Sequence, residues 1–290
     1  MALIKKSNDL IQAKYNLTLN EQRLILYLCS RVQRTDKDFQ DYEFTFADLI
    51  ELTEIDKKFI YNEIKDIAKK LLSKPIVFVK STGGQLICNW CSSFEFDKDT
   101  DTVKICFDPK LKPYLLDLKK CFTAYDKKYV SGFNSRYSFR IYELCKQYQK
   151  LKIRKMSIIE LKLYLDLEDQ YTRWSAFKDY VLTPAIADIN KHSDLFVSVT
   201  YHKTRRSITH LTFNIKSGLE HCQNEKQEAE ILQDKQAIAN SQKKQAKVKK
   251  MGNDWLKKWE KLSKKDRQRW GGEGKGFVYF RACKGIKPDQ

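Results

Sequence analysis

The first long hydrophobic stretch of the chain is apolar over a wide arc when it is read as a helix. Leu24, Leu28 and Val32 form one row, and further apolar residues fill the rows beside it. A helix of this kind is packed on several sides, so we expect it to lie inside a domain. Thr18 stands before the stretch and Glu21 follows three residues later. This is the spacing of a capping box, which predicts where the helix begins.

Two helical patterns and a hairpin pattern come next along the chain. Thr45 and Asp48 again have capping-box spacing and predict a short helix. Between residues 60 and 71, isoleucines and a leucine recur at helical spacing, opposite a polar face with several lysines. Two strand patterns then flank the tight turn 81–84. Helix, turn, helix and hairpin is the order of a winged helix, in which the second helix can enter a major groove and the hairpin is the wing.

The same order of elements recurs in the second half of the chain. A helix pattern over residues 136–149 is followed by a short strand pattern, and Ser157 with Glu160 has capping-box spacing. The long helical pattern that follows contains Pro184, which removes a backbone hydrogen bond and should kink the helix. A strand, a basic turn and another strand complete the second copy, so we interpret the chain as one architecture used twice.

These patterns predict an α+β fold of two tandem winged-helix domains with a helical, basic C-terminal extension. We assign residues 1–130 to the first domain, 131–217 to the second and 218–290 to the extension. Before the second copy, FEFDKDTDTVKICF predicts a further hairpin, and Asp108 followed by Pro109 predicts the start of a linking helix.

The charge of the chain indicates a polyanionic partner. The formal net charge is +18, of which residues 1–133 carry +3, residues 134–217 carry +7 and residues 218–290 carry +8. The first segment is therefore nearly balanced. No apolar run approaches the length needed to span a bilayer, and MALIKKSNDL lacks the apolar core of a secretory signal. We expect a cytoplasmic protein whose eight scattered cysteines are free thiols.

Three blocks of the sequence resemble the iteron-binding initiator proteins of theta-replicating bacterial plasmids. They are the opening stretch NDLIQAKYNLTLNEQRLIL, then SRYSFRIYELCKQY, then FKDYVLTPAIADINKHSDLFVSV followed by a basic hairpin. The resemblance covers roughly residues 5–217. It implies two tandem winged helices that bind double-stranded DNA. It further implies monomers that bind direct repeats (iterons) at an origin and homodimers that bind an operator inverted repeat to repress their own gene. The resemblance also implies that the protein acts at the bacterial nucleoid or a plasmid, where it recruits the host initiator ATPase and the replicative helicase.

The second domain holds the stronger candidates for DNA contact. Arg173, at the start of the groove helix, can pair bidentately with guanine, and Lys178 suits a phosphate. The wing turn presents three positive charges to phosphates or to the minor groove. A solvated helix face and a solubilising turn would have the same composition. The candidates in this domain are Tyr171, Thr172, Arg173, Ser175, Lys178, Lys203, Thr204, Arg205 and Arg206.

The first domain gives a weaker signal. Lysines opposite an apolar stripe are what any surface helix shows, and neighbouring acidic residues dilute their charge. Two glycines at the hairpin turn would let a wing approach the DNA backbone closely. The candidates in this domain are Lys58, Asn62, Lys65, Lys69, Gly83 and Gly84. The resemblance also implies that this half supplies dimer contacts.

No catalytic residue, metal ligand or cofactor site is expected. Cys88 and Cys91 have C-x-x-C spacing but lie in a strand pattern, with no second pair at zinc-site distance. No H-x-H pair or nucleophile motif is present, so we expect a protein that is not an enzyme. A winged-helix transcriptional regulator without an origin role remains the main alternative. A basic protein that binds RNA or a membrane surface is a third class, but only WLKKWEKL offers a basic amphipathic segment, and it is short, so we expect no membrane partner.

Overall fold

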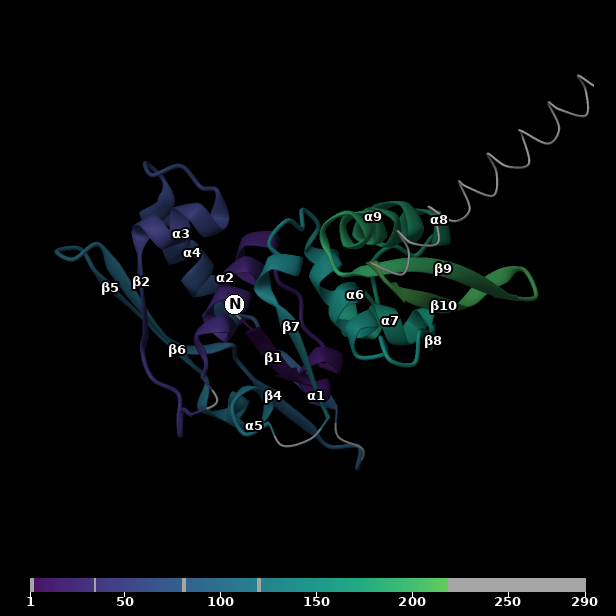
Figure 1. Ribbon diagram of the computed structural model, residues 1–290, viewed down its shortest axis with the longest axis horizontal. Coiled ribbons are helices and arrows are strands. Elements are labelled where there is room, and N and C mark those ends of the chain that lie inside the picture. The colour runs from purple at the N-terminus through teal and green to yellow at the C-terminus, as the bar shows by residue number, and fades with distance from the viewer. Residues whose placement is uncertain (1–2, 34, 80–81, 119–120, 219–290) are drawn as a thin grey trace, which may run out of the picture. The chain divides into compact units, whose positions relative to one another are not determined.

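The computed structural model of the protein describes residues 3–33, 35–79, 82–118 and 121–218 (Figure 1). Within these residues helices and antiparallel strands form two winged helices, which confirms the predicted α+β fold. The predicted C-terminal extension lies outside the described residues, except for Gly218.

The first winged helix begins where the capping boxes predicted. Thr18 caps α2 and Thr45 caps α3, and in both the acidic residue three positions on bonds back to the cap. The apolar stripe of α4 is buried as expected, at Ile60, Ile64 and Leu71 among others. The elements of this winged helix are α2 (Leu19–Arg31), β2 (Tyr42–Thr45), α3 (Phe46–Thr53), α4 (Ile60–Ser73), β5 (Cys91–Asp97) and β6 (Thr102–Phe107).

The hairpin that serves as the wing of this winged helix is not the one that the sequence predicted. Strand β6 pairs antiparallel with both β2 and β5, in the order β2-β6-β5. The predicted wing, β3 (Ile76–Val79) with β4 (Gln85–Cys88), forms a separate two-stranded sheet. The hairpin β5–β6 therefore takes the place of the wing, because it shares the sheet with the strand that precedes α3.

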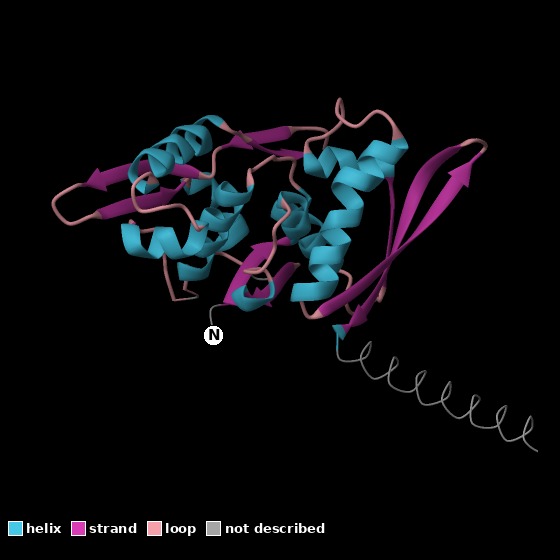
Figure 2. Ribbon diagram, turned by 90° about the horizontal axis from the view of Figure 1, so that it is seen from above, coloured by secondary structure: helices cyan, strands magenta, loops and turns pink. Residues whose placement is uncertain are grey.

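The second winged helix has the same sheet order. Strand β10 pairs with β8 on one side and β9 on the other, and the hairpin β9–β10 projects as the wing (Figure 2). Ser157 caps α7, but Glu160 does not bond back to it. The Glu160 carboxylate instead accepts a hydrogen bond from the Tyr164 hydroxyl at 2.9 Å. The elements are α6 (Arg136–Lys146), β8 (Ile153–Ser157), α7 (Ile158–Leu165), α8 (Trp174–Phe177), η3 (Lys178–Leu182), α9 (Thr183–His192), β9 (Leu195–Thr204) and β10 (Ser207–Ser217).

The long helix accommodates Pro184 by a change in its backbone rather than by the kink that the sequence predicted at the proline itself. The helix runs through three segments, of which the middle one, η3, is a π-helical turn that ends just before Thr183 and Pro184. A π turn relieves the hydrogen bond that proline cannot make, because it widens the backbone one turn earlier. One face still stays buried across all three segments, at Phe177, Val181 and Ile189 among others.

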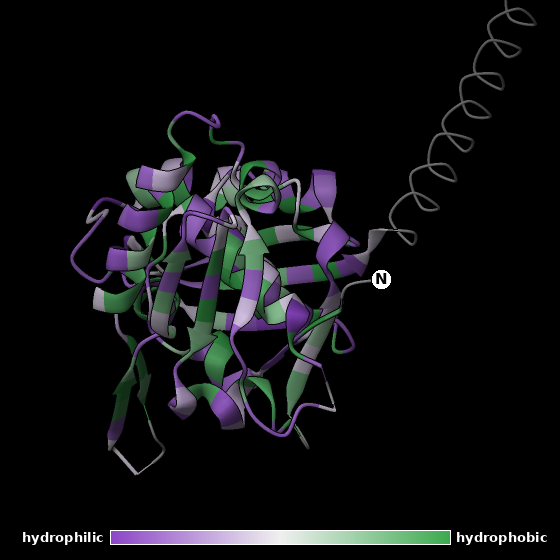
Figure 3. Ribbon diagram, turned by 90° about the vertical axis from the view of Figure 1, so that its left-hand side faces the viewer, coloured by the Kyte–Doolittle hydropathy of each residue, from purple (hydrophilic) through white to green (hydrophobic). Residues whose placement is uncertain are grey.

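Hydrophobic and hydrophilic residues alternate along these helices and strands, as the green and purple bands of Figure 3 show. The apolar side of each element contributes to one hydrophobic cluster that spans the described residues. Its largest fully buried side chains include Trp90, Phe133, Phe139, Phe177 and Phe213. Burial of this apolar surface is the main favourable term that holds the fold together.

The N-terminal segment forms a separate two-stranded sheet with the strand that precedes the second copy. Strand β1 pairs antiparallel with β7, which lies far away in the sequence. Asp108 caps the linking segment, as the sequence predicted, although that segment forms two short pieces. The elements are β1 (Leu3–Ser7), α1 (Asn8–Gln12), η1 (Pro109–Leu111), α5 (Lys112–Leu115), β7 (Phe122–Asp126) and η2 (Lys127–Tyr129).

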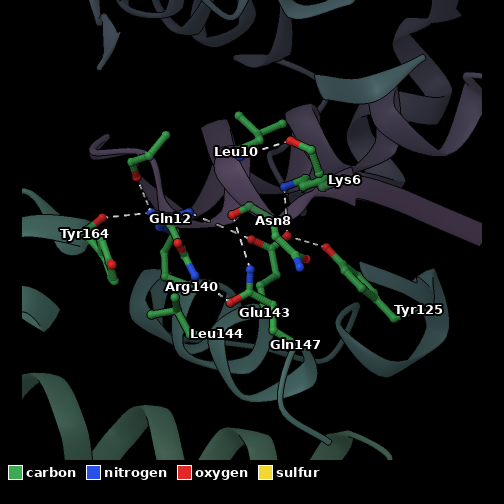
Figure 4. A network of polar contacts seen from close by, with 12 residues as sticks. Lys6, Asn8, Leu10, Gln12, Tyr125, Arg140, Glu143, Leu144, Gln147 and Tyr164 are labelled. Atoms are coloured by element: carbon green, nitrogen blue, oxygen red, sulfur yellow. Dashed lines mark hydrogen bonds and ion pairs between the residues drawn. The ribbon is translucent and has the colours of Figure 1, made fainter. Parts of the chain in front are cut away.

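A buried polar network surrounds helix α6 (Figure 4). The Lys6 ammonium lies 2.8 Å from the Glu143 carboxylate, and both side chains are fully buried. The same carboxylate accepts a hydrogen bond from the Tyr125 hydroxyl. Burial, the largest single influence, lowers the pKa of Lys6, but the charge and hydrogen bond of Glu143, together with Tyr15 and Cys29, more than offset it, so the pKa stands above its ordinary value. Lys6 is therefore charged at neutral pH and depends on Glu143 as its counter-charge.

Arg140 extends this network from the N-terminal segment to the second winged helix. Its guanidinium donates hydrogen bonds to the carbonyl oxygens of Ala13, at 2.7 Å, and Tyr164, at 2.8 Å. It also stacks over the ring of Tyr15, 3.6 Å from the ring centroid. Arg140 thereby fixes the end of helix α7, whose other face takes part in the candidate site.

Candidate nucleic-acid interface

The segments α8, η3 and α9 form the candidate recognition helix of the second winged helix. Their buried face fixes the helix on the domain, so the opposite face is left for a partner. Arg173 and Ser175 are exposed on that face, at the start of the helix. Arg173 occupies the N-cap position, makes no capping bond with its side chain, and has no carboxylate partner among the described residues. The guanidinium is thus available to a base edge or a phosphate.

The wing of the second winged helix carries its predicted positive charge at the tip. Arg205 adopts a left-handed backbone conformation, with φ of 57°, which closes the turn between β9 and β10. The side chains of Lys203, Thr204, Arg205 and Arg206 are all exposed. Within the described part of the chain none of the three cations forms an ion pair, so nothing there neutralises the tip.

The structure brings part of the predicted helix set and part of the predicted wing set together around one groove. Its volume is about 600 Å³. Two predicted residues from the helix end, Tyr171 and Thr172, face two predicted residues from the wing, Lys203 and Arg206. The remaining lining residues are Ile158, Lys162, Trp174, Phe177, Ser207 and Ile208. Three of the lining side chains are cationic and none is a carboxylate, so the groove favours an anion.

Lys162 is a part of this groove that the sequence analysis missed. Its ammonium donates hydrogen bonds to the backbone carbonyl oxygens of Gln170, at 2.8 Å, and Tyr171, at 3.0 Å. Tyr171 has a positive φ of 51°, a conformation that a bulky residue adopts only when its surroundings hold it there. In the sequence, Lys162 is simply one lysine in an amphipathic helix, so only the fold reveals that it supports the loop before the recognition helix.

An aromatic contact fastens the wing to the recognition helix. The rings of Trp174 in α8 and Tyr201 in β9 meet edge-to-face with centroids 5.2 Å apart. The Lys178 ammonium lies 5.9 Å from the Tyr201 centroid. Burial, helped by the charge of Asp179, raises the pKa of Tyr201, so its hydroxyl is neutral and can donate a hydrogen bond. Lys178 is half-buried.

Tyr180 is a second residue that sequence reasoning passed over. It lies in the π turn η3 and is 69% exposed, although neighbouring residues on that turn are buried. Its ring centroid is 6.4 Å from that of Tyr171. Large exposed aromatic residues on a recognition surface suit contact with bases or sugars. The signal in the sequence was available, since Tyr180 falls outside the apolar stripe of the helix.

The first winged helix places its predicted residues in two separate locations. Asn62 and Lys69 of α4 are exposed, as is Lys58 in the turn before this helix, while Lys65 of α4 is half-buried with its ammonium 4.7 Å from the Tyr61 ring centroid. Tyr61 in turn contacts Phe96 of β5, with centroids 5.9 Å apart. This arrangement repeats the aromatic contact of the second winged helix. Lys69 is near the carboxylate of Asp66 at 3.4 Å, which partly offsets its charge.

Gly83 and Gly84 lie outside the wing, because they belong to the turn of the separate hairpin β3–β4. Gly83 has a positive φ of 82°, which explains glycine at this turn without any partner. The actual wing of the first winged helix, β5–β6, has an acidic tip with Asp97, Asp99 and Asp101. Contact between the two glycines and DNA stays a prediction, but it no longer follows from a position on the wing.

Cys88 and Cys91, which have C-x-x-C spacing in the sequence, are both buried, and neither forms a disulfide. Burial raises the pKa of Cys88 to about 11, and burial also raises the pKa of Cys91. Thiols in this environment stay protonated near neutral pH and are poor metal ligands. Within residues 3–33, 35–79, 82–118 and 121–218, no three His, Cys, Asp or Glu side chains gather closely enough to hold a metal ion. None of the described helices is both long and apolar enough to cross a membrane.

The fold and the cationic groove together define a tandem winged-helix protein of a DNA-binding class. The family model described as "Initiator Replication protein, WH1" matches residues 3–146. The model described as "Initiator Rep protein, WH2" matches residues 157–215. The chain therefore belongs to the family of initiator Rep proteins, the plasmid replication initiators that its sequence resembles.

Two relatives illustrate the likeness. A replication initiation protein of Escherichia coli is 27% identical over 203 residues, which make up 67% of this chain and 63% of that protein. The chain thus matches slightly less than two thirds of the length of this curated relative. The crystal structure of the Pi initiator protein in complex with iteron DNA is similar with a TM-score of 0.61 and 22% identity, over 74% of this chain and 97% of that chain. This second likeness concerns the fold.

Proposed function

We propose that the protein binds direct repeats at a plasmid origin, through its second winged helix, and so initiates replication. The observation that carries the proposal is the groove where the recognition helix and the wing meet, lined by three cations and no carboxylate. Membership of the initiator family supports the origin as the target. The related Pi initiator, whose structure holds iteron DNA, supports double-stranded repeats as the ligand.

In this proposal, residues 1–130 form a domain for dimer and auxiliary DNA contacts, and residues 131–217 read the repeat. The basic segment 218–290 adds further positive charge. Monomers bind the direct repeats, and homodimers bind an operator inverted repeat and repress the gene. The hairpin β3–β4 supports a dimer surface in the first domain, since Val79 and Ile87 expose 62% and 61% of their surface on it.

The remaining parts of the proposal follow from the family resemblance. The host initiator ATPase and the replicative helicase are the partners that open and load the origin. The chain itself contributes binding and is not an enzyme, and it acts in the bacterial cytoplasm at the plasmid.

Fluorescence anisotropy with the full chain tests the proposal. The ligands are the direct repeats that flank its gene and a scrambled duplex of the same length and composition, compared over a salt series. We expect the repeats to bind about a thousandfold more tightly. Equal and steeply salt-dependent binding to both duplexes would reduce the protein to a nonspecific polyanion binder.

A replication assay separates the proposal from a transcriptional regulator without an origin role. The gene and its flanking DNA are placed on a plasmid that has no other origin. An initiator maintains this plasmid in a suitable host, and a regulator does not. The matched control carries Arg173→Ala in the same gene, which leaves the fold intact and removes an exposed candidate contact.

A further inference from the structure

We propose that the groove between α7, the start of α8 and the wing holds one backbone phosphate of the bound DNA, and that Lys162 is one of its ligands. The inference rests on the proposed function, since the phosphate belongs to DNA that the second winged helix binds. It adds a residue outside both the recognition helix and the wing. Under this proposal the recognition helix and the wing contact the same phosphate.

The groove is cationic from three directions. Lys162 comes from α7, Lys203 from β9 and Arg206 from the turn of the wing. Thr172 and Ser207 also line it, and their hydroxyl groups are potential hydrogen-bond donors. Each cation lacks a carboxylate partner within the described residues. A phosphodiester is the anion that a DNA-binding groove of this composition selects.

The ammonium of Lys162 is held in place before any ligand arrives. Two of its donors serve the carbonyl oxygens of Gln170 and Tyr171, and an ammonium has three donors. Neutral carbonyl oxygens orient the charge without cancelling it. The nitrogen also lies 5.4 Å from the centroid of Phe177, which lines the same groove. A fixed ammonium loses little side-chain entropy on binding, so it can bind a phosphate more strongly than a free surface lysine.

Stacking of an unpaired base fits the groove less well. Trp174 is the largest ring in the lining, but it meets Tyr201 edge-to-face and also contacts Phe177, with centroids 6.2 Å apart. Both faces of its surroundings are therefore partly taken by protein, and Trp174 is half-buried. Two of the three charged groups, Lys203 and Arg206, are instead exposed on the wing, and the third, Lys162, comes from α7. We therefore assign the groove to the backbone of the DNA.

The experiment compares Lys162→Met with Lys155→Met in the full chain. Lys155 is an exposed lysine of β8, at the opposite edge of the sheet from β9, and serves as the matched control. On repeat and scrambled duplexes alike, we expect Lys162→Met to weaken binding about tenfold. It should also lower the slope of log K against log salt by about 0.9, the value for one phosphate. Lys155→Met should leave the slope unchanged, and Lys162→Arg should retain it.

A purely structural role for Lys162 would weaken binding without lowering the slope, and that result would overturn the proposal. Methylphosphonate substitution provides a second test that needs no change at Lys162. Neutralising phosphates of the repeat one at a time should reveal one position that weakens the wild-type protein but does not weaken Arg206→Ala further. The same position should be silent for Lys162→Met. Different positions for the two variants would refute a shared phosphate.

These outcomes are distinguishable from failure of the proposed function. If the wild-type protein fails to prefer the repeats, the origin proposal fails, while the slope on scrambled DNA still judges Lys162. If the wild-type protein prefers the repeats and Lys162→Met leaves the slope unchanged, only the phosphate site fails.

Discussion

The two winged helices share one scaffold but differ in the charge of their wings. In the first, Tyr61 and Lys65 of α4 lie against Phe96 of β5. In the second, Trp174 lies against Tyr201 of β9, and Lys178 lies over the same ring. In each copy the lysine follows the aromatic residue of the helix by four positions. The element order and the sheet order match as well, with β2-β6-β5 corresponding to β8-β10-β9.

The wing tips show that the shared scaffold carries different surfaces. The first wing presents Asp97, Asp99 and Asp101 around a single lysine, Lys98. The second presents three cations and no acid. Acidic side chains repel a phosphate backbone and basic ones attract it. This contrast supports our proposal that the second winged helix makes the main contacts with DNA, and that the first would contact DNA only through the exposed face of α4.

The largest expected effect concerns the buried ion pair between Lys6 and Glu143, which links the N-terminal segment to helix α6 of the second winged helix. Glu143→Gln leaves the Lys6 ammonium buried without its counter-charge, and we expect a loss of about 3–5 kcal/mol in the free energy of unfolding. Urea unfolding measures it. A single cooperative transition in both proteins would show that the copies fold as one unit, and two separate transitions in the variant would show that this ion pair couples two independent domains.

The pH dependence of the same variant has a definite sign. In the wild-type protein the pKa of Lys6 is raised, so its contribution is complete at neutral pH and is lost only as the pH rises through the raised pKa. In Glu143→Gln the charge of Glu143, the main influence that raises this pKa, is lost, and burial, the largest influence, lowers the pKa. The stability of the variant should then increase from about pH 8 to pH 10, where an unfolded lysine still binds its proton. Glu168→Gln, which removes a partly exposed partner of Lys14, is the control and should cost little.

The next effect concerns sequence readout by the second copy. Arg173→Ala should weaken binding to the repeats by about 10- to 100-fold, since a bidentate contact to guanine is lost. Binding to scrambled duplex should change much less. Arg173→Lys should not restore the preference, because an ammonium cannot pair with two acceptors in a fork. Anisotropy titrations at one salt concentration compare the three proteins, and an equal loss on both duplexes would reassign Arg173 to a phosphate.

Local sequence patterns predicted the elements of this fold well, because their causes are local. The capping boxes at Thr18 and Thr45 form as predicted, and the apolar stripe of α4 is buried. The choice of wing could not be read locally, because it depends on which hairpin pairs with β2. The strand β2 itself is only four residues long, and the sequence analysis did not identify it.

The candidate site likewise combines features that local sequence predicts with features that depend on long-range contacts. Exposed charges at Arg173 and at the wing tip follow from composition and turn chemistry, and the structure places them where the sequence suggested. The role of Lys162 depends on a loop eight residues further along, and the burial of Lys6 depends on pairing between β1 and β7. Both lysines look like ordinary surface residues in the sequence, since long-range contacts leave no local pattern.

A smaller effect is expected from the second wing. Arg205→Ala combined with Arg206→Ala should weaken binding to every duplex and lower the salt slope by about one to two units. The reason is that each exposed guanidinium neutralises at most one phosphate. The salt series on repeat and scrambled DNA measures both quantities. An unchanged slope would mean that the second wing does not contact DNA phosphates. The difference in charge between the two wings would then not explain DNA binding by the second copy.

The smallest effect is expected from the acidic wing of the first copy, and it sharpens the comparison most directly. Asp99→Asn with Asp101→Asn removes two negative charges. Asp97 is left in place, because its carboxylate accepts a hydrogen bond from the Asp99 backbone at 2.8 Å and shapes the turn. Asp101 has a φ of 53°, which asparagine tolerates.

If this wing lies near DNA, the loss of repulsion should increase affinity about two- to threefold at low salt, and the gain should vanish near 0.15 M salt, where exposed charges are screened beyond about 8 Å. A gain that persists at high salt would indicate a direct contact formed by the new amides. No gain at low salt would mean that the first wing faces away from the DNA. The acidic tip would then reflect only the different orientation of the first copy, and the scaffold that the two copies share would carry DNA contacts in the second alone.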